Sequence, residues 1–111
     1  MGDHLMPLGP ITIETGDAIP GTFTYTAVNG TSPYTYDITF SGIGGSGIVG
    51  NITGGENNVV DFDGTLARAG SYVIEIRGKV TDTPGQVNQS DADDIEYYTI
   101  TVNPIVAIWV V

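Results

Sequence analysis

Apolar and polar side chains alternate along four stretches of this chain, and this two-residue period constrains the fold more than any other feature. The stretches are residues 21–29, 33–40, 71–80 and 96–103. In the third, Tyr72, Ile74 and Ile76 fall on one side, and Glu75 and Arg77 fall on the other. Such a period places alternate side chains on opposite faces of a β-strand, one toward a core and one toward water. Residues that favour helices are scarce, with three Leu, one Lys and four Glu among 111 residues, so we predict an all-β fold.

Weaker strand patterns fill much of the remaining chain. They lie at residues 11–14, 47–52 and 57–62, and turn-forming sequences such as NGTSP, TGGENN and TPGQ separate the strands. About seven short strands at this spacing predict an antiparallel β-sandwich or barrel. We expect a flexible tail over residues 1–10, one β-sandwich domain over residues 11–103 and a separate apolar segment over residues 104–111. The predicted core consists of Phe23, Tyr25, Tyr34, Tyr36, Ile38, Tyr72, Ile74, Ile76, Tyr98, Ile100 and Val102.

Three groups of aromatic, aliphatic and turn residues form an ordered set of motifs. They are Gly30, Pro33, Tyr34 and Tyr36; then Gly70, Tyr72, Ile74, Ile76, Val80, Asp82 and Gly85; and finally Tyr98, Ile100 and Val102. Over residues 11–103 this set resembles the immunoglobulin-like, cadherin-like and PKD-like repeat modules of bacterial and phage surface proteins. The resemblance implies an immunoglobulin-like sandwich at a cell or particle surface, acting in spacing, adhesion or sugar binding, and it implies no catalytic residue. Two departures are the inserted Arg77-Gly78-Lys79, which indicates a longer or bulged strand, and the long acidic loop at residues 85–96.

A glycine-rich segment, Gly42-Ile43-Gly44-Gly45-Ser46-Gly47, matches the G-x-G-x-x-G pattern of dinucleotide-binding proteins, and Asp61 and Asp63 follow it. That pattern binds a pyrophosphate only where a parallel strand leads into a helix whose N-terminal amides hold the anion. The sequence after Gly47 is IVGNITGGENN, which is a poor helix former. We therefore interpret the segment as a flexible connection or an irregular edge strand.

The residue inventory gives little support for catalysis. The chain has no Cys and a single histidine, His4, in the predicted N-terminal tail, and it contains no G-x-S-x-G nucleophile motif. Three basic residues face thirteen acidic ones, for a formal net charge of −10. Because nucleic-acid binding depends on Lys and Arg at the phosphates, this charge argues against it, and an anionic membrane surface would also repel the chain.

Acidic residues at alternate positions make calcium the cation to consider. Carboxylate oxygens are the hard ligands that Ca²⁺ prefers, and loops gather at the two ends of a sandwich. The five candidate calcium ligands are Asp61, Asp63, Asp91, Asp93 and Asp94. Ordinary solvated acidic loops are the alternative interpretation, and the full EF-hand pattern is absent.

The last seven residues, IVAIWVV, are all apolar. They are too few to span a bilayer, and an exposed apolar strand invites association. Three interpretations remain open: the chain's own last strand, a strand added to a neighbouring subunit, or the start of a following domain. The residues expected to bind a partner are Ile105, Val106, Ile108, Trp109 and Val110.

These observations together favour a non-enzymatic structural or interaction module. The chain lacks the positively charged and apolar regions of a signal peptide, which favours a virion decoration or tail component over a module of the bacterial cell surface. The expected partners are protein subunits of a larger assembly or neighbouring repeats. A carbohydrate-binding module, with calcium assisting, is the alternative function, and it would use Trp109, Tyr97 and the acidic residues at 91–96 beside a surface glycan.

Overall fold

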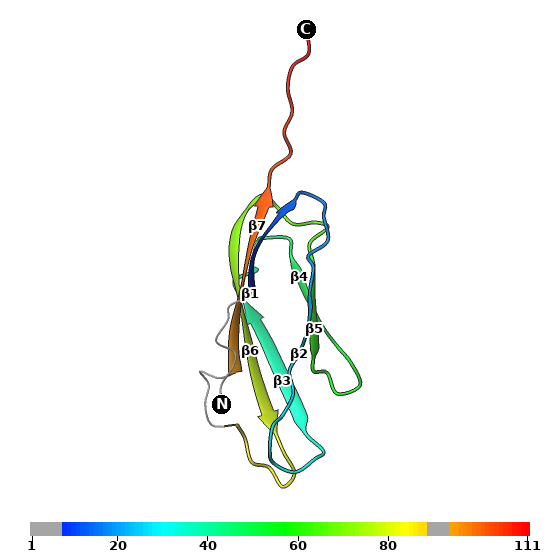
Figure 1. Ribbon diagram of the computed structural model, residues 1–111, viewed down its shortest axis with the longest axis vertical. Coiled ribbons are helices and arrows are strands. Elements are labelled where there is room, and N and C mark those ends of the chain that lie inside the picture. The colour runs from blue at the N-terminus through cyan, green and yellow to red at the C-terminus, as the bar shows by residue number, and fades with distance from the viewer. Residues whose placement is uncertain (1–7, 89–93) are drawn as a thin grey trace.

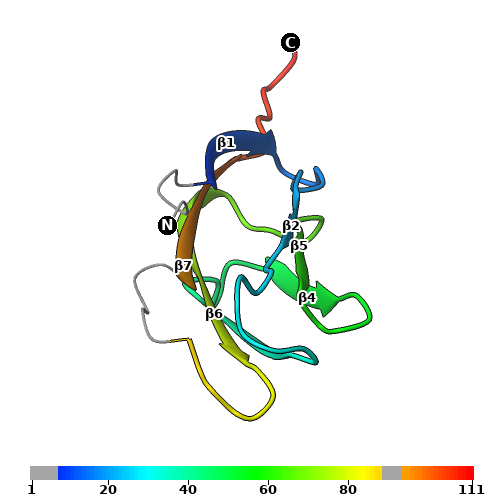
Figure 2. The same cartoon turned by 60° about the horizontal axis from the view of Figure 1, so that its bottom comes forward.

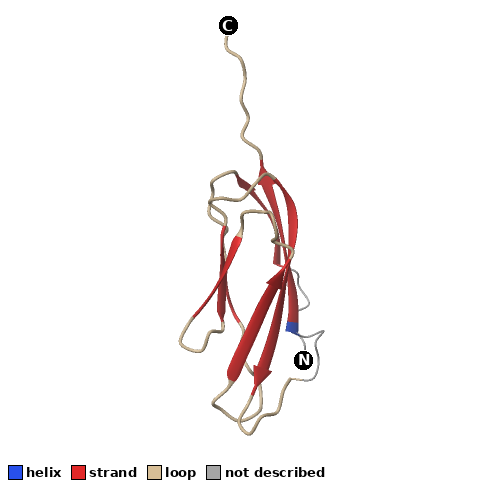
Figure 3. Ribbon diagram, turned by 180° about the vertical axis from the view of Figure 1, so that it is seen from behind, coloured by secondary structure: helices blue, strands red, loops and turns tan. Residues whose placement is uncertain are grey.

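The computed structural model describes residues 8–88 and 94–111, and these form seven β-strands (Figure 1). The only helical element in the described part is a single 3₁₀ residue, Asp94, directly before the last strand (Figure 3). The strands are β1 (Leu8–Glu14), β2 (Thr22–Thr24), β3 (Thr35–Ser41), β4 (Val49–Thr53), β5 (Val59–Asp63), β6 (Gly70–Thr81) and β7 (Ile95–Asn103). The predicted all-β class is confirmed.

The strands form two sheets that lie face to face (Figure 2). One sheet has the order β1-β7-β6-β3 and the other has the order β2-β5-β4. The three-stranded sheet and the β7-β6-β3 part of the larger one reproduce the B-E-D and G-F-C strand orders of an immunoglobulin sandwich. All pairings are antiparallel except β1 with β7, which is parallel. The predicted β-sandwich is confirmed, and this one pair is the exception to its antiparallel character.

The predicted strands agree with the observed ones to within two residues except at β1 and β2. β1 begins at Leu8, so residues 8–10 belong to a strand and the predicted tail over residues 1–10 is wrong there, while residues 1–7 lie outside the described residues. The alternating pattern of residues 21–29 predicts a long strand, whereas β2 ends at Thr24. Beyond it the backbone bonds to other partners: the Tyr25 carbonyl accepts from the Asn58 side chain at 3.0 Å, and the Ala27 amide donates to the Tyr36 hydroxyl at 3.1 Å. The inserted Arg77-Gly78-Lys79 lengthens β6 to twelve residues, and its pairing with β3 is continuous across all three residues, so it forms no bulge.

Aliphatic side chains dominate the space between the sheets. Of the predicted core, the side chains of Ile38, Ile74, Ile76, Tyr98, Ile100 and Val102 are buried. Five predicted core aromatics are only half-buried: Phe23, Tyr25, Tyr34, Tyr36 and Tyr72. The four tyrosines among them carry hydroxyls that need a polar partner, which keeps the ring ends near the surface. The core also contains Ile13, Ile19, Ile48, Val60, Phe62 and Ala67, which the predicted list omits.

The hydroxyl of Tyr72, near the start of β6, donates to the carbonyl of Arg68 at 2.7 Å. A tyrosine at the start of the sixth strand that bonds back to the preceding corner is a hallmark of immunoglobulin-like sandwiches. It fixes the connection between β5 and β6 and therefore the crossing from one sheet to the other. Tyr72 belongs to the second group of motif residues in the sequence, which begins at Gly70. The sequence did not predict the hydrogen bond of its hydroxyl.

The glycine-rich segment forms the crossing from β3 in one sheet to β4 in the other. The Ser46 side chain is 1 % exposed, and its hydroxyl donates to the Ile43 carbonyl at 2.7 Å. The Arg68 amide donates to the Ser46 carbonyl at 2.7 Å. Gly47 has a φ of +81°, and a Cβ there would lie 2.1 Å from the Leu66 carbonyl oxygen. The segment is thus a connection, one of the two predicted alternatives, and it forms a compact turn packed against the β5–β6 corner.

Candidate functional site

Residues 104–111 leave the sandwich at the end of β7 and run away from it as an extended segment, the C-terminal tail (Figure 1). Pro104 has no backbone N–H to donate to a sheet. Neighbouring strands also end here: Gly70 of β6 pairs with Val102, and Glu14 of β1 pairs with Asn103. The tail therefore has no partner strand among residues 8–88 and 94–111.

The predicted partner-binding residues are all exposed apolar side chains of the tail. The side chains of Ile105, Val106, Ile108, Trp109 and Val110 are 79–97 % exposed. The interpretation of the tail as the chain's own last strand is therefore wrong, because Asn103 is the final strand residue. Addition to a neighbouring subunit and the start of a following domain remain as predictions.

The predicted calcium ligands lie on different elements. Asp61 and Asp63 project from the outer face of β5, where Asp61 accepts from the Asn51 side chain at 3.0 Å. Asp63 accepts from the Thr65 amide at 2.9 Å and from the Thr65 hydroxyl at 2.8 Å, and these bonds lower the pKa of the Asp63 carboxyl. Asp91 and Asp93 lie outside the described residues. Within residues 8–88 and 94–111 no three acidic or histidine side chains gather as a metal-binding group, and calcium binding stays a prediction.

Asp94 takes part in a polar cluster at the start of β7 instead. Its carboxylate accepts hydrogen bonds from the Tyr25 hydroxyl and from the Asn88 side chain. The Asn88 side-chain oxygen in turn accepts the Val80 amide at 2.8 Å. Partial burial, followed by the adjacent Asp94 carboxylate, raises the pKa of the Tyr25 phenol. The cluster ties the β2–β3 connection to the β6–β7 connection.

Asp82 joins the same two connections at the end of the sandwich opposite the tail (Figure 1). Its carboxylate accepts from the Thr31 amide at 3.1 Å and from the Gln86 amide at 2.7 Å. Close by, the Thr83 amide donates to the Thr31 carbonyl at 2.9 Å. The backbone hydrogen bonds, that from Thr31 first, lower the pKa of the Asp82 carboxyl. Backbone amides that donate to the Asp82 carboxylate and to the Thr31 carbonyl therefore hold the β2–β3 and β6–β7 connections together at this end.

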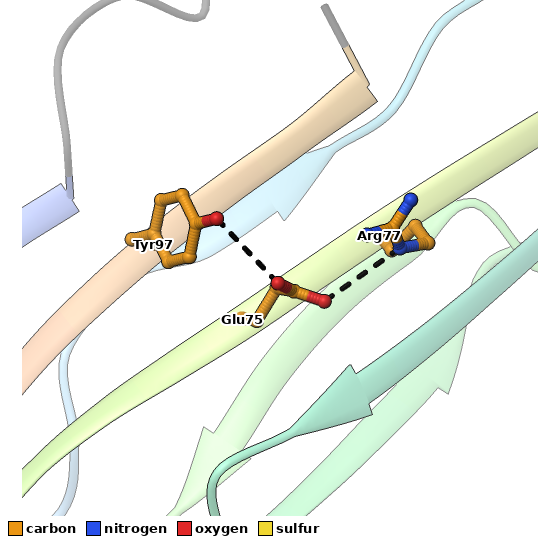
Figure 4. Close-up of polar contacts among 3 residues, drawn as sticks. All are labelled: Glu75, Arg77 and Tyr97. Atoms are coloured by element: carbon orange, nitrogen blue, oxygen red, sulfur yellow. Dashed lines mark hydrogen bonds and ion pairs between the residues drawn. The ribbon is translucent and has the colours of Figure 1, made fainter. Parts of the chain in front are cut away.

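The outer face of the four-stranded sheet carries a small polar group (Figure 4). The Tyr97 hydroxyl lies 3.5 Å from one Glu75 carboxylate oxygen, and Arg77 Nε lies 3.6 Å from the other. Tyr97 is also part of the predicted sugar-binding set, whose other aromatic is Trp109. Strand β7 alone carries the chain about 20 Å from Tyr97 to Asn103, and the tail continues away from there. The two aromatics therefore do not form one sugar platform.

Strands β3 and β4 are the outermost strands on one side of the sandwich, and in the part of the chain that the structure describes each has a free edge. The inward-facing side chains there are less buried than the rest of the core: Phe40 is half-buried and Ile52 is 37 % exposed. The Phe40 ring reaches across to Phe62 at 5.2 Å between centroids and covers Gly50, where a Cβ would lie 2.5 Å from the ring. We call this side of the sandwich, between the edges of β3 and β4, the open side. The sequence did not predict it, although the connection between β3 and β4 is too short to contain another strand.

In comparisons with known proteins, no family model, curated protein or solved structure matches this chain. The resemblance to surface repeat modules accordingly stays a prediction, carried by the motifs and the strand order. In the part of the chain that the structure describes, no helix has the length and apolar character needed to cross a membrane.

Proposed function

We propose that this chain is a non-enzymatic interaction module that joins an assembly through its C-terminal tail. The observation that carries the proposal is the exposure of the tail: five large apolar side chains are 79–97 % exposed on a segment that pairs with no strand of the described chain. Contiguous apolar surface of this kind is uncommon on a monomer and is typical of a protein–protein contact. The motif resemblance supports a setting on a virus particle or a bacterial cell surface.

The physical basis of docking is the chemistry of the tail. It is apolar on both faces and contains no charged side chain, which is the pattern of a strand covered on both sides. An extended peptide of this kind adds to the edge of a sheet, where main-chain hydrogen bonds and alternate side chains both contribute. The polar clusters of the sandwich engage one another or the backbone, which supports a structural part for them within the sandwich.

The test is the association state of the full chain, measured by sedimentation equilibrium in moderate salt, where the self-repulsion of a chain with net charge −10 is screened. We expect species heavier than the 11.6 kDa monomer. The double variant Ile108→Ser, Trp109→Ser should be monomeric. The matched control is Val28→Ser with Leu66→Ser, which alters side chains that are 82 % and 80 % exposed elsewhere and should leave association intact. A monomeric full chain, or equal loss in the control, would overturn the proposal.

A further inference from the structure

We infer that the tail of one copy docks on the free edge of β3 in a second copy, where it adds a fifth strand to the four-stranded sheet. This inference rests on the proposed function and names the partner as another molecule of the same chain. The juxtaposition that carries it is an extended apolar segment that pairs with no described strand and a strand edge, unpaired in the described part of the chain, over an incompletely covered core.

The hydrogen-bonding capacity of the β3 edge follows from the pairing of β6. The Val80 carbonyl accepts the Asn88 amide at 3.1 Å and the Val80 amide donates to the Asn88 side chain, so both backbone groups of Val80 point away from β3. Backbone N–H and C=O groups alternate in direction along an antiparallel strand. The backbone groups of Lys79 and Arg77 therefore point toward β3, where these residues pair with Asp37 and Thr39.

The remaining backbone groups of β3 therefore face outward. Those of Tyr36, Ile38 and Phe40 point toward the free edge, which offers donors and acceptors to an added strand. The same three residues have inward-facing side chains, so a strand bonded there would lie against the open side of the core.

The other sheet edges are less suited to an eight-residue apolar segment. β1 contains Pro10 and an irregular register between Leu8 and Ile11, features that protect an edge from pairing. β2 has three residues and β4 has five, whereas β3 has seven. Of these three edges, β3 offers the longest to an extended apolar segment.

The side chains on the open side are also suited to this occupant. A strand beside β3 would lie between the edges of β3 and β4, where its inward-facing apolar side chains would cover Phe40 and Ile52. No charged side chain of β3 faces inward, since Asp37 projects outward opposite Lys79. The side chains of the tail carry no charge, so they can pack against β3 of a strongly acidic copy without a like-charge contact.

Docking occurs between molecules because the tail cannot reach the β3 edge of its own domain. β6 lies between β7 and β3 in the sheet. The tail continues away from the end of β7 along the long axis of the molecule, which measures 71 Å against 25 and 19 Å for the others (Figure 1). Each copy thus presents one tail and one acceptor edge.

Residue-resolved amide hydrogen exchange of the full chain, at concentrations below and above association, tests the inference without altering the fold. We expect the amides of Tyr36, Ile38 and Phe40 to exchange at least tenfold more slowly in the associated state. The internal control is the free edge of β4, where Gly50 and Ile52 should be unchanged. The tail variant Ile108→Ser, Trp109→Ser should lose the added protection of β3.

The outcomes separate the inference from the proposed function. If the chain associates through its tail but protection rises at Gly50 and Ile52, or at neither edge, the β3 assignment is overturned while the proposed function stands. If the full chain does not associate at any concentration, the proposed function fails and the inference fails with it.

Discussion

The backbone amide of Ile48 donates to the hydroxyl of Ser46 at 3.0 Å, inside the turn that joins the two sheets. Ser46 is the one polar residue among the buried residues of the described chain, at 1 % exposure. Its hydroxyl donates in turn to the Ile43 carbonyl. The glycine-rich segment therefore has a hydrogen-bonded serine at its centre, which explains how so many glycines can form an ordered crossing.

Replacing this hydroxyl tests its structural role. Ser46→Ala leaves the buried Ile48 amide without its acceptor, which should lower the free energy of unfolding by about 1–3 kcal/mol. Chemical denaturation measures the change. Ser71→Ala is the control, because its hydroxyl contacts Thr101 at an exposed site, and it should change stability by less than about 0.5 kcal/mol. Equal effects of the two substitutions would refute the role of Ser46.

Gly47 and Gly45 form a matched pair for testing the tight approach to the β5–β6 corner. Both have positive φ, +81° and +77°, but only at Gly47 would a Cβ meet the Leu66 carbonyl, because nothing lies within 4 Å of a Cβ at Gly45. Gly45→Ala should cost only the roughly 1–2 kcal/mol of a left-handed conformation. Gly47→Ala should cost clearly more, measured as a larger fall in melting temperature. Similar shifts for both variants would contradict the packing described.

The Tyr72 corner should contribute one hydrogen bond to stability. Tyr72→Phe removes the 2.7 Å contact with Arg68 and keeps the ring, so we expect a loss of about 1 kcal/mol in the free energy of unfolding. Tyr97→Phe removes a hydroxyl on the outer face whose nearest partner is 3.5 Å away and serves as the control, with little expected change. If Tyr72→Phe is as stable as the parent chain, the corner is not a stabilising feature.

Low pH should destabilise the end of the sandwich where Asp82 joins the β2–β3 and β6–β7 connections. The pKa of Asp82 is lowered in the folded chain from its ordinary value of 3.8 by backbone donors. Stability from this group is therefore fully present above that value and is lost as the pH falls through the lower folded pKa. Asp82→Asn keeps an acceptor oxygen but does not titrate, so its unfolding free energy should fall less steeply below about pH 4. Thermal melts across that range measure the slope, and an unchanged slope would contradict the assignment.

The strands were predictable where one side of the alternation is buried. Ile74 and Ile76 of β6 lie two residues apart, as do Ile100 and Val102 of β7, and all four side chains are buried. The early end of β2 was not predictable, because the backbone of Tyr25 and Ala27 bonds to the Asn58 and Tyr36 side chains, and no local pattern marks these contacts. Ile19 and Ala67 enter the core from connections, where no period marks them.

The pairing of the strands was harder to predict from the sequence than the strands themselves. The apolar pattern of β1 is equally compatible with parallel and antiparallel pairing, and only the structure places it parallel to β7. For the tail, its composition predicted an unusual apolar segment, while its separation from the sandwich follows from the ends of β1 and β6. The open β3 edge depends on the topology of the whole chain and has no local signal.

Trp109 reports on the central claim directly, because it is the only tryptophan of the chain and lies in the tail at 97 % exposure. Its fluorescence can be followed as the full chain is concentrated, together with quenching by a neutral quencher such as acrylamide. Docking of the tail predicts a shift of the emission to shorter wavelength and a progressive loss of quenching as the chain associates. A fully quenchable, solvent-exposed Trp109 at every concentration would contradict the account.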